Sequence, residues 1–366
     1  MNILFFQNVI SPHQMPYIQY LPKMEGVEDV LVIVPDVSLD ERSASGWDVK
    51  KWLKTEGIRF IVAPWPDDVE ELIESYADKD TWCLFSGINA FPSVAEWFRL
   101  SLRCRVKRGI ITEPPYVYEH PLWQHAIRFA LKDWRYVKYI DKVFVMGDDY
   151  LNYYRFWSKR WEVIPFMYCT EWRERNDNKN KKENKNKNER LRVVYVGNLS
   201  RRKNVGCLLK AAMLLSEEEQ QQMEIGIVGD GEERGALERL AAGLTTPVKF
   251  YGTLPMERIP EMMEQYDVLV LPSLHDGWGA VVNEALTLGL YVICSDHCGA
   301  KRLIGDENKG LIFKSNNPDD FANCLTTCIR QCQKIRSGVT ERVEWSKLQI
   351  SGEAVAEFFL SQLKGK

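Results

Sequence analysis

The chain lacks the long apolar stretch of a membrane-spanning protein. No run in its 366 residues approaches the ~20 consecutive apolar residues that a helix needs to cross a bilayer. Residues 1–7 also lack the basic segment and cleavage site of a secretory signal. These absences predict a cytoplasmic protein, which meets the inner membrane, if at all, as a peripheral protein on its cytoplasmic face.

Paired cysteines are missing as well. The nine cysteines are scattered without a C-x2-C framework, which indicates free thiols in a reducing compartment. Cys324, Cys328 and Cys332 recur every fourth residue and therefore line one face of a helix. They fit either a three-thiol metal site or buried small apolar side chains, and the lack of a fourth ligand nearby favours burial.

The chain has no excess of basic charge, and its second half has little tryptophan. A net charge of −3 gives no sign of nucleic acid as a partner, because domains that bind it are usually clearly basic. Ten of the twelve tryptophans precede residue 173, which leaves only Trp278 and Trp345. The first half is therefore expected to carry a specialised surface or cleft.

Short apolar runs alternate with helical stretches along the chain. This alternation is typical of parallel sheets wrapped by helices. Between two such series, residues 176–190 contain only Asn, Asp, Lys, Glu and Arg, so they cannot bury enough apolar surface to form a core and are expected to be a solvated loop. Strands are predicted at residues 2–7, 29–34, 58–62, 82–85, 109–112 and 142–146, and again at residues 191–197, 223–228, 248–251, 267–271 and 310–313.

The most informative stretch covers residues 268–296. Its short apolar run ends at Pro272, which predicts a buried parallel strand. Gly277 and Gly279 follow, and they allow the backbone to come close to a ligand. A helix expected to begin near Ala280 would direct its unpaired N–H groups and the positive end of its dipole at the same place. This pattern predicts an anion site at the carboxyl end of the strand.

Two carboxylates accompany this anion site. Asp276 lies on the turn, and Glu284 lies about one helical turn into the helix. A phosphate at the helix end with acids beside it suits a nucleotide sugar, because the acids accept hydrogen bonds from sugar or ribose hydroxyls. A plain helix-surface acid and an N-cap are the alternative reading of these two residues.

The segment Pro-Ser-Leu-His-Asp-Gly-Trp-Gly-Ala-Val-Val-Asn-Glu-Ala resembles the E-x7-E segment of the retaining GT-B glycosyltransferases of family 4. Asp276 stands for the first Glu of that pattern, Trp278 for its usual Phe, and Glu284 is unchanged. The resemblance implies an α/β fold of GT-B type, with two Rossmann-like domains whose parallel sheets face a central cleft. The expected domains are residues 1–165, joined by a returning helix at 345–366; a linker and polar loop at 166–190; and a nucleotide-sugar domain at 191–344.

The family resemblance also implies a donor site in the second half. Gly-Asn-Leu-Ser-Arg-Arg-Lys at residues 197–203 is similar to a Gly-Arg-Leu-x-x-x-Lys motif whose cations hold the donor diphosphate. Lys203 matches the lysine, whereas Asn198 replaces the arginine; Arg201 and Arg202 fit either phosphate contact or a solvated turn. Segments around Gly229 and Leu254 resemble those near the nucleoside. The predicted donor-binding residues are Gly197, Asn198, Arg201, Arg202, Lys203, Gly229, Leu254, Gly277, Trp278, Gly279 and Ala280.

Two polar residues of the first half are further candidates. Ser11-Pro12-His13-Gln14 replaces the family's Gly-Gly loop; with Ser11 as N-cap and Pro12 in the first helical turn, the helix dipole would keep His13 neutral. His13 then contacts substrate or serves as a cap. Glu113 follows a strand near where the family commonly has a His, so it is a candidate contact to the sugar or base toward the acceptor, with His120 as its rival. Both can also be structural.

A basic and aromatic segment at residues 97–108 has two interpretations. Such a pattern suits an anionic membrane surface that presents a lipid-linked acceptor, and it equally suits a solvated helix end, which we favour.

These features together predict a retaining glycosyltransferase that uses a UDP- or GDP-linked sugar and a glycan or lipid-linked acceptor, with surface polysaccharide synthesis as the context implied by the family. Asp276, Glu284, Glu113 and His13 are the catalytic candidates. Neither cofactor nor metal is expected, because Lys203 and the helix end would stabilise the leaving diphosphate. Three alternatives stay open: a metal-dependent transferase using Asp78-Lys79-Asp80, a nucleotide-sugar epimerase, and a catalytically silent nucleotide-binding protein.

Overall fold

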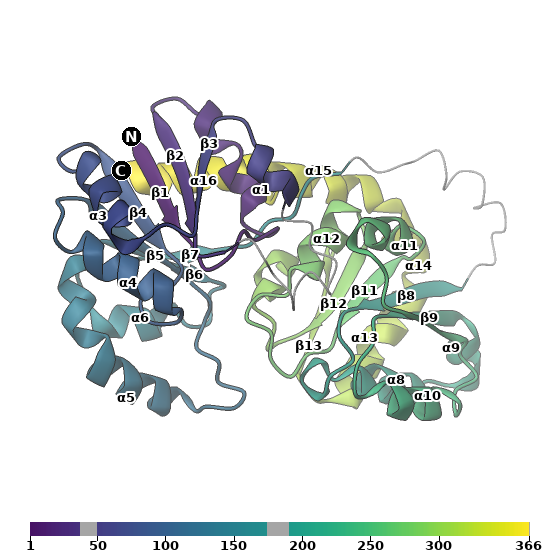
Figure 1. The fold of residues 1–366 in the computed structure, drawn as a ribbon. Helices are drawn as coiled ribbons and strands as arrows, with labels where there is room; N and C mark the ends of the chain where they lie inside the picture. Colours follow the sequence, from purple (N-terminus) through teal and green to yellow (C-terminus); the bar gives the residue numbers. More distant parts are fainter. Residues whose placement is uncertain (37–49, 174–189, 366) are drawn as a thin grey trace. The chain divides into compact units, whose positions relative to one another are not determined.

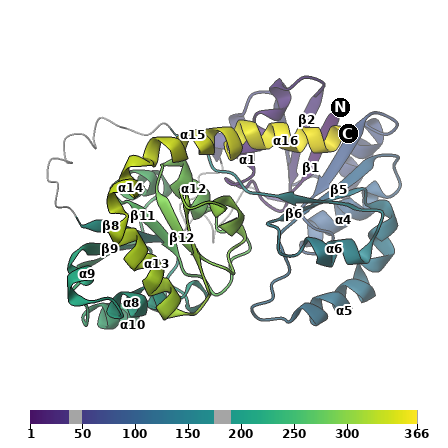
Figure 2. The ribbon, with the colours of Figure 1, turned by 180° about the vertical axis from the view of Figure 1, so that it is seen from behind.

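Two parallel β-sheets organise the chain, and each has its own helices (Figures 1 and 2). The computed structural model describes residues 1–36, 50–173 and 190–365. It divides the chain into unit 1, Met1–Glu171 with Ser351–Lys366, and unit 2, Trp172–Ile350. The predicted polar loop at 176–190 lies outside the described residues, apart from Arg190.

Unit 1 contains a seven-stranded parallel sheet in the order β3-β2-β1-β4-β5-β6-β7. All five residues of β1, at its centre, are buried, which fits their continuous apolar sequence. The strands are β1 (Asn2–Phe6), β2 (Asp29–Val34), β3 (Ile58–Val62), β4 (Thr81–Phe85), β5 (Lys107–Thr112), β6 (Lys142–Met146) and β7 (Glu162–Phe166). The helices of this unit are α1 (Met15–Ile18), α3 (Pro66–Ser75), α4 (Pro92–Ser101), α5 (Leu122–Lys132), α6 (Leu151–Trp157) and α16 (Gly352–Lys364), with 3-10 turns η1 (Leu21–Lys23), η2 (Lys50–Lys54) and η3 (Trp134–Tyr139).

Strand β7 was not predicted from the sequence. Pro165 lies within it, opposite Val145 of β6, and a proline normally argues against a strand because it cannot donate to the ladder. β7 is the edge strand of the sheet, so one side of its backbone needs no partner. The edge position therefore explains how this proline is accommodated.

Helix α16 belongs to unit 1 although it follows unit 2 in sequence. Ser351 caps it, its hydroxyl accepting a hydrogen bond from the Ala354 N–H at 3.2 Å. Phe359 on this helix packs against the rings of Phe5 and Phe144, with centroids 5.9 and 4.9 Å away. Residues from both ends of unit 1 therefore form one aromatic core.

Unit 2 contains a six-stranded parallel sheet in the order β10-β9-β8-β11-β12-β13. Both units are thus Rossmann-like α/β domains, as the alternation of strands and helices predicts. The strands are β8 (Leu191–Val196), β9 (Met223–Val228), β10 (Val248–Gly252), β11 (Val268–Leu271), β12 (Tyr291–Ser295) and β13 (Gly310–Phe313). The helices are α8 (Val205–Met213), α9 (Glu217–Gln221), α10 (Arg234–Ala241), α11 (Ile259–Met263), α12 (Val281–Thr287), α13 (Pro318–Arg330), α14 (Cys332–Ser337) and α15 (Val339–Gln349), with 3-10 turns η4 (Arg201–Lys203), η5 (Met256–Arg258) and η6 (Gly299–Ile304).

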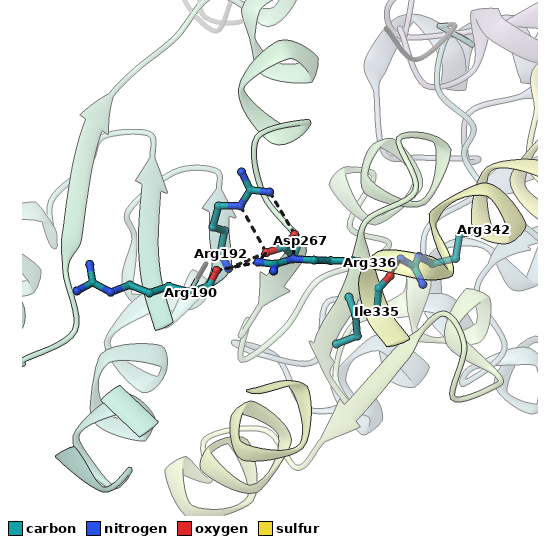
Figure 3. A network of polar contacts seen from close by, with 6 residues as sticks. All are labelled: Arg190, Arg192, Asp267, Ile335, Arg336 and Arg342. Carbon is teal, nitrogen blue, oxygen red and sulfur yellow. Dashed lines mark hydrogen bonds and ion pairs between the residues drawn. The ribbon is translucent and has the colours of Figure 1, made fainter. Parts of the chain in front are cut away.

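A buried carboxylate, Asp267, ties three elements of unit 2 together (Figure 3). Its oxygens accept hydrogen bonds from Arg336 at 3.0 and 3.1 Å and from the Arg192 backbone N–H at 2.9 Å. Burial alone would raise the pKa of Asp267, but Arg336 and Arg192 outweigh it and hold the pKa below its usual range. The start of β11 is thereby joined to β8 and to α14.

Asp267→Asn is expected to lower the free energy of unfolding by about 2–4 kcal/mol near pH 7, because it leaves two partly buried arginines without a carboxylate. The pKa of Asp267 is depressed in the folded chain, so this stabilisation is present above the unfolded pKa of ~3.9 and is lost as the pH falls through the folded value. Thermal or urea unfolding measures the loss. Asp319→Asn, at an exposed acid of α13, is the matched control, and equal losses in the two variants would contradict the prediction.

The acidic sequence Asp78-Lys79-Asp80 forms a turn and not a metal site. It lies between α3 and β4, at the amino end of the strand, whereas ligands of parallel sheets bind at the carboxyl ends. Asp80 pairs with Lys107 at 2.8 Å, and Asp78 lies 3.7 Å from Arg105. These ion pairs fit the turn interpretation of this sequence.

Burial of the aromatic side chains argues against the membrane interpretation of residues 97–108. Trp97 and Phe98 are buried in the core of unit 1, because they lie on the inner face of α4. Arg108 is also buried, and its guanidinium donates to the Ser101 hydroxyl at 3.0 Å and the Cys104 carbonyl at 2.7 Å. This segment is therefore structural.

The three regularly spaced cysteines fit the packing interpretation. Cys324 and Cys328 are buried on α13, and burial raises the pKa of Cys324 to about 11, which keeps its thiol protonated. Within residues 1–36, 50–173 and 190–365, no group of three His, Cys, Asp or Glu side chains is placed to hold a metal ion. No helix among these residues is both long and apolar enough to cross a membrane.

Candidate functional site

The loops after β8 and β9 meet at the carboxyl edge of the sheet in unit 2. Gly197 N–H donates to the Val228 carbonyl at 3.0 Å, and Leu199 N–H donates to the Asp230 carbonyl at 2.9 Å. At Gly229, where φ is +129°, a Cβ atom would lie 1.9 Å from the Gly197 carbonyl oxygen. Only glycine fits this contact. Gly197 and Gly229, predicted as donor contacts, thus also have a packing role.

The loops after β8 and β11 are joined by an ion pair between Lys203 and Asp276. The Lys203 Nζ lies 2.5 Å from Asp276 Oδ2, and the two side chains are only 18% and 12% exposed. Ser273 adds its hydroxyl, 3.5 Å from the same oxygen. The sequence predicted separate contacts, Lys203 to phosphate and Asp276 to sugar. The structure brings these two predicted site residues together, and their charges neutralise each other.

Backbone contacts fix the position of this ion pair. Leu274 N–H donates to the Arg202 carbonyl at 2.8 Å, and the Arg202 guanidinium donates to the His275 carbonyl at 2.7 Å. Arg202 therefore holds the two loops in register in addition to its predicted phosphate contact. Arg201 is exposed.

A tyrosine that the sequence analysis missed supports the same loop. The Tyr195 hydroxyl donates to the Asn198 carbonyl at 2.8 Å, and the ring is fully buried. Burial, followed by the nearby charge of Asp276, raises the pKa of Tyr195 well above its usual range, so the hydroxyl keeps its proton. The side chain of Asn198 lies on the surface.

The side chain of the glycine-flanked tryptophan is buried, so a donor contact of this residue is expected from its backbone. Trp278 is 2% exposed, and its indole N–H donates to Asn283 Oδ1 at 2.7 Å. Its ring lies in the core of unit 2, and this hydrogen bond anchors the loop to α12. Gly279 has φ +94°, and a Cβ atom would meet Leu271 and Cys298 at 2.7 and 2.9 Å.

Helix α12 begins at Val281 with Ala280 as its N-cap, as predicted. Its seven residues include Glu284 in the first turn. Burial raises the pKa of Glu284 from 4.5 to about 7, and Arg173 partly offsets this rise. Of the predicted acids, Asp276 is thus ion-paired, whereas Glu284 is a carboxyl group balanced between its charged and neutral forms near neutral pH.

The raised pKa of Glu284 predicts how stability changes with pH. Below the pKa of the unfolded chain, the carboxyl group is protonated in both the folded and the unfolded chain, so it does not lower the free energy of unfolding. As the pH rises through the folded value of about 7, the buried charge destabilises the native chain. The melting temperature of Glu284→Gln is therefore expected to rise relative to the wild type between about pH 5 and about pH 8.

Thermal unfolding without nucleotide measures this difference. Glu344→Gln, at an exposed position of α15, is the control and should follow the wild type at every pH. A pH-independent difference for Glu284→Gln would contradict the assignment.

In unit 1, His13 and Glu113 both contact Tyr168, a residue that the sequence analysis missed. The Tyr168 hydroxyl donates to Glu113 Oε1 at 2.9 Å, and its ring centroid lies 6.0 Å from that of His13. The structure therefore brings these two predicted residues to one place. His120 is exposed and its ring lies 6.2 Å from that of His125 instead.

His13 is held neutral, but by a different cause from the one predicted. Burial lowers its pKa to about 4. Helix α1 begins only at Met15, because residues 11–14 form a turn in which the Ser11 carbonyl accepts from Gln14 and Met15, and Pro16, not Pro12, occupies the first helical turn. The helix dipole is therefore not the cause.

A pocket of about 280 Å³ lies in unit 1, at the carboxyl ends of β4 and β5. Asn89 and Glu113 come from the loops that follow these strands, and Asp133 comes from the end of α5. The Asn89 amide donates to Asp133, whose pKa burial raises. Polar side chains in its wall are Asn89, Thr112, Glu113, His125, Arg128, Asp133, Tyr153 and Tyr154. Apolar side chains such as Ile110, Phe129 and Trp161 complete the wall, and a pocket of this size with both kinds of side chain suits a small polyhydroxylated group.

Comparison with known proteins places most of unit 2 with one family model. Residues 176–337 match the model of glycosyl transferases group 1. This part of the chain is thus similar to group 1 glycosyl transferases, and it contains Lys203, Asp276 and Glu284.

Individual relatives match about a third of the chain. The chain is 31% identical over 134 residues to sulfoquinovosyl transferase SQD2 of Arabidopsis thaliana, covering 37% of this chain and 25% of that protein. It is 32% identical over 135 residues to the alpha-D-kanosaminyltransferase of Streptomyces kanamyceticus, covering 36% and 35%. It is 30% identical over 129 residues to O-antigen chain mannosyltransferase B of Escherichia coli, covering 34% and 33%. The matched region thus spans a quarter to about a third of each relative.

Solved structures extend the likeness to the whole fold. Anabaena Alr3699/HepE, in complex with UDP, superposes with a TM-score of 0.72 at 17% identity over all of both chains. Sucrose-phosphate synthase from Thermosynechococcus elongatus gives a TM-score of 0.64 at 18% identity, over 100% of this chain and 98% of that one. These neighbours confirm the predicted fold class, α/β with two Rossmann-like domains of GT-B type.

Proposed function

We propose that the chain is a retaining glycosyltransferase of the family 4 kind, which transfers a sugar from a UDP- or GDP-linked donor to a hydroxyl group of a glycan or lipid-linked acceptor. The observation that carries the proposal is the Lys203–Asp276 pair between glycine-containing loops at the carboxyl edge of a parallel sheet. Glu284 lies in the first turn of the next helix, α12, and all three residues lie in the region similar to glycosyl transferases group 1.

The ion pair provides a way to bind a charged donor. A diphosphate carries more negative charge than Asp276, so it competes with Asp276 for Lys203. The charge of Lys203 then stabilises the diphosphate as the leaving group. Asp276, released from the lysine, then accepts hydrogen bonds from sugar hydroxyls. Glu284, with its pKa near 7, accepts or donates a hydrogen bond to the sugar or ribose. On this proposal the charge of Lys203 and the loop N–H groups stabilise the negative charge of the leaving diphosphate, which a metal ion does in other transferases.

Acceptor binding is assigned to unit 1. The pocket beside Glu113 takes a sugar of the acceptor, and His13, Tyr168 and Glu113 contact the reacting hydroxyl group. By analogy with the family, the departing phosphate itself removes the proton of that hydroxyl.

Similar proteins support a donor and a context. The HepE structures contain UDP, UDP with glucose, and UDP-glucose, which makes UDP-glucose the first donor to test. Relatives include an O-antigen mannosyltransferase and the amylovoran biosynthesis glycosyltransferase AmsK of Erwinia amylovora. We therefore propose a cytoplasmic step in surface polysaccharide synthesis.

The experiment is a screen of nucleotide sugars with the purified chain. Thermal shift with UDP and GDP identifies the base, and release of nucleoside diphosphate, with and without glycan or lipid-linked acceptors, measures transfer; the anomeric configuration of the product tests retention. We expect one donor to be turned over without added metal, in the presence of a chelator. Nucleotide binding without turnover of any donor would favour a silent binding protein, and a changed sugar that stays on its nucleotide would favour an epimerase; either result overturns the proposal.

A further inference from the structure

Helix α5 in unit 1 presents most of its apolar side chains to solvent. Among its 11 residues only Phe129 is buried, where its ring packs against Trp157 and Trp161 with centroids 4.6 and 5.9 Å away. Trp123, Ile127 and Leu131 recur every fourth residue, so they form a stripe on one face of the helix. Their exposed fractions are 61%, 51% and 80%. An exposed stripe of this kind lacks the burial that normally stabilises an amphipathic helix.

The apolar surface continues beyond α5. Trp134, at the start of η3, is 56% exposed, and its ring lies 6.3 Å from that of Trp157 on α6. Phe156, also on α6, is 80% exposed and lies 5.3 Å from the same Trp157 ring. Figures 1 and 2 both show α5 and α6 as neighbours on unit 1. We call this surface the α5 face; it comprises Leu122, Trp123, Ile127, Leu131, Trp134 and Phe156.

Basic side chains surround the α5 face. Arg128, Lys132, Arg135 and Lys138 are exposed along α5 and η3, and none of them forms an ion pair within the described part of unit 1. Arg155, Lys159 and Arg160 are exposed on and after α6. The exposed acids nearby are Glu119, before α5, and Asp148 and Asp149, before α6, whereas Asp133 is half-buried against Asn89. The region is therefore clearly basic.

We propose that the α5 face docks the chain on a bilayer that contains anionic lipids. Tryptophan and long aliphatic side chains enter the boundary between headgroups and acyl chains, and surrounding lysines and arginines attract anionic headgroups. The seven basic side chains favour a bilayer with anionic lipids over an uncharged apolar partner, because a positively charged surface is complementary to a negatively charged one. Docking by this face would place the neighbouring pocket, which Arg128 and Phe129 also line, next to the membrane surface.

Vesicle flotation of the full chain tests the proposal without any nucleotide sugar, so its outcome is separate from that of the proposed function. The chain is expected to float with vesicles of equal phosphatidylglycerol and phosphatidylcholine, but not with phosphatidylcholine alone, and to be released at about 0.5 M salt. Equal binding to both vesicles, or to neither, would overturn the proposal.

Variants locate the surface. Leu131→Ser and Phe156→Ser are each expected to weaken binding about 10-fold, since each removes a side chain that is exposed in the free chain and buried in lipid. Leu348→Ser, 72% exposed on α15 of unit 2, is the matched control and should bind normally.

Lys132→Gln and Lys159→Gln should each weaken binding about 5-fold, with Lys210→Gln as control. If Leu131→Ser instead splits a dimer in size-exclusion chromatography and leaves vesicle binding unchanged, the face is a contact between copies and the proposal is wrong.

Discussion

Lys203→Ala is expected to reduce sugar transfer at least about 10²-fold, because it removes the positive charge that would stabilise the leaving diphosphate. The variant also leaves Asp276, only 12% exposed, without its cation. Lys203→Arg should retain part of the activity, since it keeps a charge in the same place. Release of nucleoside diphosphate under saturating donor measures the effect, and Lys210→Ala on α8 is the matched control.

A second substitution separates catalysis from stability. Combining Lys203→Ala with Asp276→Asn removes both charges of the pair, so the cost of an unpaired buried carboxylate disappears. Thermal stability should recover toward that of the wild type, whereas activity should stay low. If activity recovered together with stability, Lys203 would be a structural residue and the donor-site assignment would fail.

Glu284→Gln is expected to lower transfer by at least about 10²-fold while the fold stays intact. The amide keeps the shape of the side chain but cannot accept hydrogen bonds through a charged group or shuttle a proton. Nucleotide binding, measured by thermal shift with UDP or GDP, should persist in this variant, because the diphosphate contact is assigned to Lys203. Glu344→Gln is the control, and normal turnover in Glu284→Gln would remove Glu284 from the site.

The strands were largely predictable because buried parallel strands have continuous apolar sequences. β2 and β9, for example, have the predicted bounds. β7 was missed because Pro165 hides a strand that exists only at the edge of its sheet. The order of the strands could not be read, since it depends on pairings such as β1 with β4, whose residues are 79 positions apart in the case of Asn2 and Thr81.

The candidate site was predictable as a set of residues but not as a set of contacts. A local motif can suggest Lys203 and Asp276 separately, but their ion pair joins residues 73 positions apart. Trp278 was assigned to the donor because it stands at the aromatic position of the family segment; its burial and its hydrogen bond to Asn283 arise from packing that no local pattern shows. Tyr168 was missed because nothing in its own sequence shows that Glu113 and His13 meet there.

Because α16 completes unit 1, this domain is assembled from two distant parts of the chain. During synthesis, residues 172–350 are available before residues 351–364, so unit 2 can fold while Phe5 and Phe144 still lack the Phe359 ring that covers them. The amino-terminal sheet, although made first, is finished last. Over that interval its aromatic core has exposed apolar surface, which makes the nascent protein prone to aggregation.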